Sequence, residues 1–286
     1  MRNSPHFDRL YALVHAALFP PEGRARIAFA LTFGALVHLM FASGVAAMLF
    51  SMYFGLSKGL GTLAWPYAAL ANAALILQFP LVHSLLLGPR GSKVLARLVP
   101  GEHGSTLGTS TYALIAGGQL FLLFVCWSPS GIIWWEAEGV ILYLMTGLYA
   151  CAWLLVGKAT WDAGIEVQSG ALGWLSVLAK RKPVFPDMPT TGLFRIIRQP
   201  IYVAFALTLW TVPVWTPDQL ALASVWTSYC LAAPILKERR FKQRYGARFE
   251  AYRSAVPYAL PGGASQKERR TYGQPPEETQ TQAPKS

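Results

Sequence analysis

Long apolar runs separated by short polar connections dominate the chain. They cover residues 27–50, 63–87, 111–127, 139–157, 200–215 and 219–236. An α-helix rises 1.5 Å per residue, so the first two runs are long enough to cross the roughly 30 Å of bilayer hydrocarbon. The fifth, about 24 Å long, is expected in a thinned or protein-shielded position. The pattern predicts an all-α, polytopic integral-membrane helix bundle with about six transmembrane helices.

Composition supports this prediction. Length alone allows one or two domains, but apolar residues make up 53% of the chain and charged residues only 14%. Such values are typical of a membrane protein rather than of a soluble core.

The distribution of charge predicts an orientation. Basic residues crowd the N-terminus, the connections after the second and fourth runs, and the C-terminal region. The other connections carry Lys58, then Glu136 and Glu138, then Asp218. By the positive-inside rule both termini are expected to be cytoplasmic, which requires an even number of spans.

A net charge of +11 also raises the question of nucleic acid. These charges flank apolar runs and form no basic soluble domain, so anionic lipid headgroups are the expected partners and no nucleic-acid role is predicted.

The runs divide the chain into five parts. Residues 1–26 form a basic segment whose apolar stretch 10–19 is either an interfacial helix or a simple flank that sets topology. Residues 27–157 hold four transmembrane helices. Residues 158–197 form a cytoplasmic loop or lid, in which 172–178 is expected to lie along the membrane interface with Trp161 and Trp174 as anchors. The C-terminal hairpin occupies 198–261, and the polar stretch 262–286 reads as a disordered tail.

The hairpin gathers polar groups at one membrane face. Arg198, Gln199 and Tyr202 stand at the start of one apolar run, and Glu238 stands at the end of the next. Pro200 suits a first helical turn with Gln199 as its cap, and such a helix start attracts an anion that Arg198 can grip with two hydrogen bonds. Glu238 adds a negative charge. A ligand with both a carboxylate and a cationic centre matches these groups, and S-adenosylmethionine is such a ligand.

Several motifs resemble the isoprenylcysteine carboxyl methyltransferase superfamily of integral-membrane, S-adenosylmethionine-dependent enzymes. They are Gly-Leu-Phe-Arg-Ile-Ile-Arg-Gln-Pro-Ile-Tyr at 192–202, Lys237-Glu238-Arg239, Tyr245-Gly246, Tyr252 and Val256-Pro257. The N-terminal half is similar to the branch of bacterial methanethiol S-methyltransferases and NnrU-type proteins, through His83-Ser84, Ser110-Thr111-Tyr112 and Trp127-Ser128-Pro129.

The resemblance implies a methyltransferase in a bacterial inner membrane that acts on a small or lipophilic thiol, or on a carboxylate. It implies a cofactor site made by Arg198, Gln199, Tyr202, Glu238 and Tyr252. No catalytic residue is assigned, because displacement at a sulfonium mainly requires a close, aligned and dry arrangement of donor and acceptor.

The chain departs from the family pattern at three positions. Gln199 replaces the histidine of a usual Arg-His-Pro, Lys237 replaces the first residue of a usual Glu-Glu pair, and Phe249 stands where tyrosine is common. A glutamine supplies only neutral donor and acceptor groups, so an orienting role for Gln199 is favoured over proton transfer.

Two other functions stay open: a non-catalytic membrane protein that retains the fold, and an NADPH-dependent membrane reductase with a related hairpin. Cys126, Cys151 and Cys230 lie in apolar runs without metal-like spacing, so buried inert thiols and no metal site are expected. His38 and His83 fall in spanning runs, and for His83 an interhelical hydrogen bond is preferred over catalysis.

Overall fold

The computed structural model describes residues 5–99 and 101–261, and most of them are helical. The helices are α1 (Pro5–Leu18), α2 (Arg24–Tyr53), α3 (Tyr67–Leu86), α4 (Pro89–Leu98), α5 (Gly108–Cys126), α6 (Gly139–Asp162), α7 (Ile165–Gln168), α8 (Ala171–Leu178), the 3-10 helix η1 (Gly192–Arg195), α9 (Pro200–Trp210), α10 (Pro217–Tyr245) and α11 (Ala247–Ala255). Two short strands, β1 (Trp135–Glu136) and β2 (Val214–Trp215), complete the described elements. The predicted tail 262–286 lies outside the described residues.

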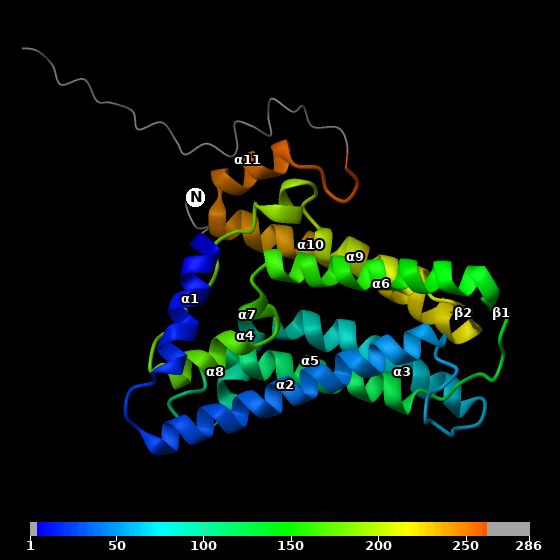
Figure 1. Cartoon of the computed structure of the whole chain (residues 1–286), viewed down its shortest axis with the longest axis horizontal. Helices are drawn as coiled ribbons and strands as arrows, with labels where there is room; N and C mark the ends of the chain where they lie inside the picture. Colours follow the sequence, from blue (N-terminus) through cyan, green and yellow to red (C-terminus); the bar gives the residue numbers. More distant parts are fainter. Residues whose placement is uncertain (1–4, 100, 262–286) are drawn as a thin grey trace, which may run out of the picture.

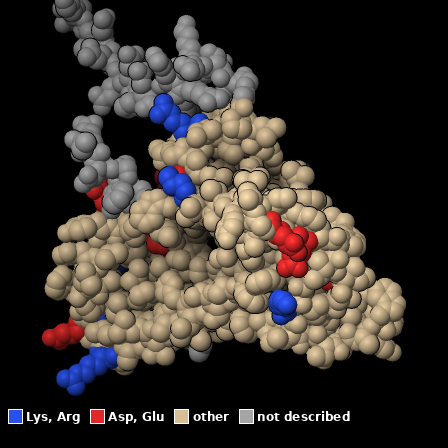
Figure 2. Space-filling view, turned by 45° about the vertical axis from the view of Figure 1, so that its right-hand side comes forward, with Lys and Arg blue, Asp and Glu red and all other residues tan. Residues whose placement is uncertain are grey.

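Five helices, α2, α3, α5, α6 and α10, are long and apolar enough to cross a membrane. They run side by side along the long axis of the molecule, together with the shorter α9 (Figure 1). Only 11% of the apolar stretch of α6 is buried inside the protein, and the space-filling view shows a wide surface without charged side chains (Figure 2). The protein is therefore an all-α, polytopic integral-membrane protein, as the apolar runs predict.

The helix expected over 200–215 is shorter than predicted. α9 ends at Trp210 after 11 residues, a rise of about 16 Å. Pro213 has no N–H with which to continue the helix, and the chain becomes extended as β2. β2 pairs antiparallel with β1, with hydrogen bonds of 2.9 Å from Trp134 N to Trp215 O and from Ala137 N to Pro213 O. The pairing satisfies backbone groups that lipid could not.

Two glycines allow α2 and α5 to pack backbone to backbone. A methyl group added at Gly44 would collide with the carbonyl oxygen of Gly117, and one added at Gly117 would press on the backbone of Met40 and Phe41. Small residues at helix crossings are a common way to bring membrane helices together. Around this crossing lies the main core, which includes Met52, Leu123, Phe124 and Trp226.

The segment 172–178 is helical, as expected, and its position along the membrane interface stays a prediction. It forms α8, whose Leu172, Val177 and Leu178 are buried, and it packs against α2 and α5. The expected anchor Trp174 points inward and donates from Nε1 to His38 Nε2 at 3.0 Å. The physical reason is close packing at Gly173, where an added side-chain carbon would meet Ser110.

The expectation of three buried thiols is wrong for two of them. Cys126 and Cys151 are exposed on the outside of the bundle, and Cys230 is buried. Apolar runs contain both inward-facing and lipid-facing positions, so membership of a run does not by itself imply burial.

Successive spans alternate in direction, so α3, α6 and α10 finish at the same end of the bundle, where α4, α8 and α11 also lie (Figure 1). We call it the basic end, because its connections carry Arg90, Lys93 and the run Lys180 to Lys182. β1 and β2 lie at the opposite end. The cytoplasmic placement of the basic end stays a prediction.

Candidate functional site

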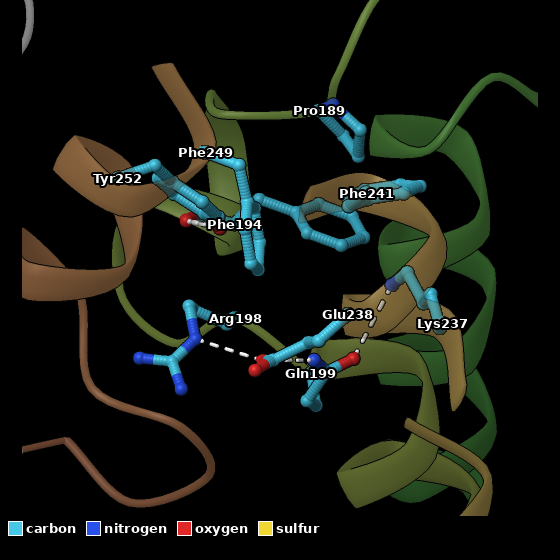
Figure 3. A pocket seen from close by; sticks show the side chains of 9 residues that line it. All are labelled: Pro189, Phe194, Arg198, Gln199, Lys237, Glu238, Phe241, Phe249 and Tyr252. Atoms are coloured by element: carbon cyan, nitrogen blue, oxygen red, sulfur yellow. Dashed lines mark hydrogen bonds and ion pairs between the residues drawn. The ribbon is translucent and has the colours of Figure 1, made fainter. Parts of the chain in front are cut away.

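A pocket lies at the basic end, where the start of α9 meets the C-terminal part of α10 and α11 (Figure 3). Its cavity volume is about 10 Å³, which is room for about one water molecule. It is lined by four aromatic side chains, four polar or charged ones and a proline: Phe194, Phe241, Phe249, Tyr252, Arg198, Gln199, Lys237, Glu238 and Pro189. The hairpin thus gathers its polar ends at one pocket, as the sequence predicts.

The chain enters the pocket through a turn that requires glycine. Gly192 has a φ of +59°, and a side-chain carbon there would collide with the carboxylate of Asp162 at the end of α6. Asp162 Oδ2 accepts a hydrogen bond from Leu193 N at 2.8 Å and its other oxygen pairs with Lys158. The end of α6 therefore fixes η1 and the residues that follow it.

The start of α9 is held by the segment after α11. Arg198 N donates to Pro257 O at 2.9 Å, and Gln199 N donates to Tyr258 O at 3.2 Å. Pro200 is the first residue of α9, as expected, but the Gln199 side chain makes no capping hydrogen bond. The reason is that Gln199 points its amide toward α10 instead.

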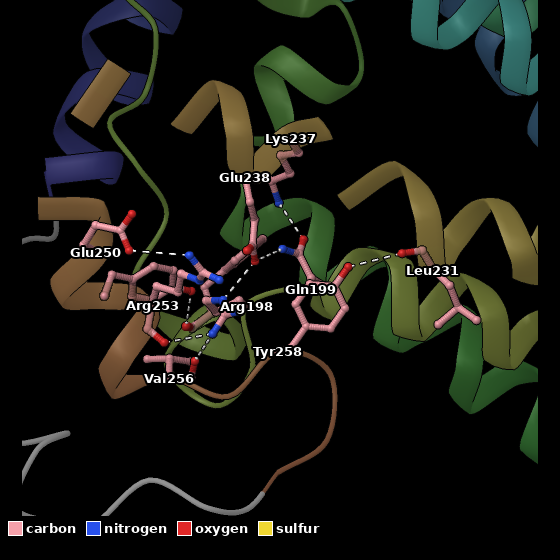
Figure 4. Close-up of polar contacts among 11 residues, drawn as sticks. Arg198, Gln199, Leu231, Lys237, Glu238, Glu250, Arg253, Val256 and Tyr258 are labelled. Atoms are coloured by element: carbon pink, nitrogen blue, oxygen red, sulfur yellow. Dashed lines mark hydrogen bonds and ion pairs between the residues drawn. The ribbon is translucent and has the colours of Figure 1, made fainter. Parts of the chain in front are cut away.

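Arg198 connects three parts of the site. Its Nε donates to Glu238 Oε1 at 2.9 Å, and its Nη1 donates to Arg253 O at 2.9 Å and to Val256 O at 2.6 Å (Figure 4). The guanidinium carbon also lies 5.5 Å from the centre of the Tyr258 ring. Burial raises the pKa of the Tyr258 hydroxyl, and the carboxylate of Glu238 raises it further. The phenol therefore stays protonated and neutral at physiological pH.

Gln199 lies between the two charged residues of α10. Its side-chain Nε2 donates to Glu238 Oε1 at 2.8 Å, and its Oε1 accepts from Lys237 Nζ at 3.3 Å. Only 2% of the residue is exposed. Two of the three departures from the family pattern, Gln199 and Lys237, are thus in direct contact.

The Lys237 ammonium is surrounded by aromatic rings. Its nitrogen lies 5.3 Å from the ring centre of Phe194, 5.5 Å from that of Phe241 and 5.8 Å from that of Tyr202. These distances are within the range of cation–π attraction. Tyr202 itself does not line the pocket and reaches it through Lys237.

Tyr252 contributes its ring to the pocket and its hydroxyl to the scaffold. The hydroxyl donates to Phe194 O at 2.6 Å, and the side chain is buried. Of the five expected cofactor residues, the structure thus places Arg198, Gln199, Glu238 and Tyr252 in the pocket wall.

The aromatic wall is what sequence reasoning missed. Phe194 lies inside the motif at 192–202, and Phe241 stands one helical turn after Lys237. Their positions in the sequence could therefore have placed both side chains near the site. Pro189 also lines the pocket, whereas α8 packs elsewhere, so only the end of the expected lid comes near the pocket.

His83 lies apart from this wall. Its ring packs against Phe79 and Tyr112, each with a centre-to-centre distance of 4.9 Å. Within residues 5–99 and 101–261, no group of three or more potential ligands is arranged to hold a metal ion.

Two polar atoms at the pocket have no hydrogen-bond partner in the part of the chain that the structure describes. Glu238 Oε2 and Arg198 Nη2 make no hydrogen bond within residues 5–99 and 101–261, because Glu238 uses Oε1 and Arg198 uses Nε and Nη1. The site can therefore offer an acceptor to an ammonium group and a donor to a carboxylate, next to aromatic faces that suit a cation.

Comparisons with known proteins give a consistent set of relatives. A methanethiol S-methyltransferase from a Pseudomonas species is 30% identical over 200 residues, which cover 70% of this chain and 75% of that protein. The enzyme of the same name from Crocosphaera subtropica is 29% identical over 196 residues, 68% of this chain and 75% of its own. One from Mycobacterium tuberculosis is 26% identical over 196 residues, 68% of this chain and 78% of its own. No protein-family model and no solved structure matches.

Proposed function

Because the chain belongs to the methanethiol S-methyltransferase family, we propose that it is an integral-membrane methyltransferase that transfers a methyl group to a thiol. The resemblance of its motifs to that branch is confirmed by the relatives. The observation that carries the proposal is the pocket in which Arg198, Gln199 and Glu238 converge at the basic end of the bundle.

Membership of this family implies a methyl donor, and we propose S-adenosylmethionine. Glu238 Oε2 would accept from its ammonium, Arg198 Nη2 would donate to its carboxylate, and the aromatic wall suits its sulfonium. The donor would supply an activated methyl group on a positively charged sulfur. A cavity of about 10 Å³ is far below the roughly 300–1,000 Å³ of most ligand sites, so the wall must move outward to admit the donor.

For the acceptor we propose a small or lipophilic thiol. Glu238, the carboxylate that lines the pocket, is already engaged by Arg198 and Gln199, which leaves it poorly placed to act as a strong base. A thiolate acceptor needs no general base, so the residues of the pocket wall only have to align the two sulfur atoms and exclude water. This favours a thiol over an alcohol or an amine.

The position of the pocket also fits the proposed setting. It lies at the basic end, beside Arg239 and Arg240, where the positive-inside rule places the cytoplasm and its soluble donor. An uncharged acceptor can approach from the bilayer, and anionic lipids are the proposed neighbours of the basic connections. We infer a bacterial inner membrane with both termini cytoplasmic.

Ligand binding to the purified protein in detergent tests the proposal. Titration calorimetry should detect S-adenosylmethionine and S-adenosylhomocysteine at micromolar to millimolar concentration and should detect no NADPH. With labelled donor and methanethiol, membranes should release a volatile labelled thioether. Binding of NADPH alone would instead support the reductase alternative, and the absence of any binding would support a non-catalytic role. If the label is instead found in lipid extracts, the acceptor is lipophilic and is not a small thiol.

A further inference from the structure

Lys237 is not used by the donor site described above. Its ammonium points toward Gln199 at the pocket wall (Figure 3), and within the described residues its one hydrogen bond goes to Gln199 Oε1 at 3.3 Å. An ammonium group has three N–H donors, so two of them make no hydrogen bond within the described part of the chain.

The charge of Lys237 is also not balanced. Within residues 5–99 and 101–261, no carboxylate lies within 4.0 Å of Nζ, because Glu238 Oε1 is bonded to Arg198 and Gln199. Arg198 and Glu238 neutralise each other at 2.9 Å. The charged and titratable groups around Lys237 are Glu238, Arg240, Arg198, Tyr202 and Tyr252. Their sum leaves the pocket with excess positive charge.

The surroundings of this charge favour one kind of anion. Aromatic rings of Phe194, Tyr202 and Phe241 stand around Nζ, so a bound anion would be largely removed from water. A small, polarisable, weakly hydrated anion loses least by this transfer, and a thiolate is such an anion.

We propose that Lys237 is a catalytic residue that binds the thiol acceptor as its thiolate, with Gln199 as the positioning residue that holds the ammonium. This proposal rests on the proposed function and names the form of the acceptor at the same site. The thiol gives its proton to solvent, and the thiolate pairs with the Lys237 ammonium. A sulfur lone pair then forms the bond to the methyl carbon, while the bond from that carbon to the donor sulfonium breaks with its electron pair on the donor sulfur. Two uncharged thioethers result.

The arrangement accounts for turnover as well as for binding. A simple thiol is mostly protonated at neutral pH, since its pKa is about 8.5 or above. A cation within about 4–6 Å lowers the pKa of such a group by roughly one to three. The methylated product has no charge, so it loses its attraction to Lys237 at the moment it forms.

Anion binding separates this proposal from donor binding. The probe is thiocyanate, a small sulfur anion, titrated into protein in detergent that is saturated with S-adenosylhomocysteine. The variants are Lys237→Met, which removes the charge with similar length, and Lys237→Arg, which keeps it. The matched control is Lys242→Met on the same helix, because Lys242 is 64% exposed and pairs with Glu250 outside the pocket.

We expect Lys237→Met to weaken the binding of thiocyanate at least tenfold and to change the affinity for S-adenosylhomocysteine by no more than about threefold. Lys237→Arg and Lys242→Met should bind thiocyanate as the wild type does. In Lys237→Met, the rise of kcat/KM for methanethiol with pH should occur at a pH that is higher by about one unit or more. Unchanged thiocyanate binding and an unmoved profile in Lys237→Met would overturn the inference alone. Wild-type protein that binds no S-adenosylhomocysteine would overturn the proposed function and this inference with it.

Discussion

Arg198 and Glu238 lie 40 positions apart and meet through a hydrogen bond of 2.9 Å from Nε to Oε1, with only 10% and 15% of their side chains exposed. The pair fastens the start of α9 to α10. A pair so little exposed holds its geometry at a cost in desolvation, so removing one member leaves the other charge poorly solvated.

Glu238→Gln should therefore affect both stability and binding. The amide keeps the shape but not the charge, so Arg198 loses its counter-ion. We expect a loss of about 1–3 kcal/mol in unfolding free energy and at least tenfold weaker binding of S-adenosylhomocysteine. Denaturation in detergent and calorimetry measure the two effects. Glu250→Gln is the control because Glu250 is 40% exposed, and an equal loss of ligand affinity there would argue against a local role for Glu238.

Arg198→Lys tests whether charge alone is enough. The guanidinium donates hydrogen bonds to Glu238 and to two backbone carbonyls at once. The ammonium group of lysine has a different geometry and cannot make all three hydrogen bonds. Hydrogen exchange at residues 253–258 should become faster, and binding of S-adenosylhomocysteine should weaken about tenfold or more. Wild-type exchange in that segment would show that the carbonyl bonds do not hold it.

Gln199→His restores the usual family residue but places an imidazole next to the Lys237 ammonium. We expect binding of S-adenosylhomocysteine within about tenfold of wild type, no large gain in rate, and no new dependence on pH near the imidazole pKa of about 6.5. A pH–rate profile of both proteins decides between the roles. A large acceleration confined to the histidine variant would mean that position 199 transfers a proton.

The contact between Gln199 and Lys237 predicts coupling between their substitutions. Lys237→Glu alone places a second carboxylate beside Glu238, whereas together with Gln199→His it recovers the usual pattern. In a double-mutant cycle of unfolding free energies, we expect the pair to be more stable than the sum of the single changes by about 0.5–3 kcal/mol. Additive effects would indicate that the contact carries no coupling energy.

Gly44→Ala should loosen the bundle. Its methyl group would strike the carbonyl of Gly117, so α2 and α5 must separate, at a cost of about 1–3 kcal/mol. Gly147→Ala is the matched control, because nothing lies within 4 Å of the added carbon on α6. Thermal unfolding in detergent should show a lower midpoint for the first variant and no decrease for the second.

Asp187 links the end of the loop to α11. Its hydrogen bond with Arg248, 2.6 Å long, holds the pKa of Asp187 below its ordinary range. A lowered folded pKa gives stability that is complete above the ordinary value of about 3.9 and is lost as pH falls through the lower value. Asp187→Asn should thus speed hydrogen exchange at residues 183–190 at neutral pH, and the difference from wild type should shrink as the pH falls below the ordinary value of about 3.9. Both side chains are more than half exposed, so the effect is small.

Hydropathy predicted the spans because a bilayer imposes a length and excludes charge, and it placed the starts of α6 and α9 at the observed residues. It failed where tertiary contacts decide. The end of α9 depends on Pro213 together with the pairing of β2 with β1, and the burial of α8 depends on a close approach to α5. The site was predicted in part for the same reason: the hairpin fixes which ends meet, but not that Lys237 would turn toward Gln199 between aromatic rings.

The hydrogen bonds from Arg198 to the carbonyl oxygens of Val256 and Pro257 also have a consequence for biosynthesis. Arg198 leaves the ribosome well before its partners, since Val256 follows 58 positions later. The spans α2 to α6 can enter the membrane and pack during that interval, but Arg198 cannot reach its final position until the last helix has been made. A nascent chain that stops anywhere before residue 256 would thus be inserted and inactive. The pocket can therefore form only after residue 256 has been synthesised.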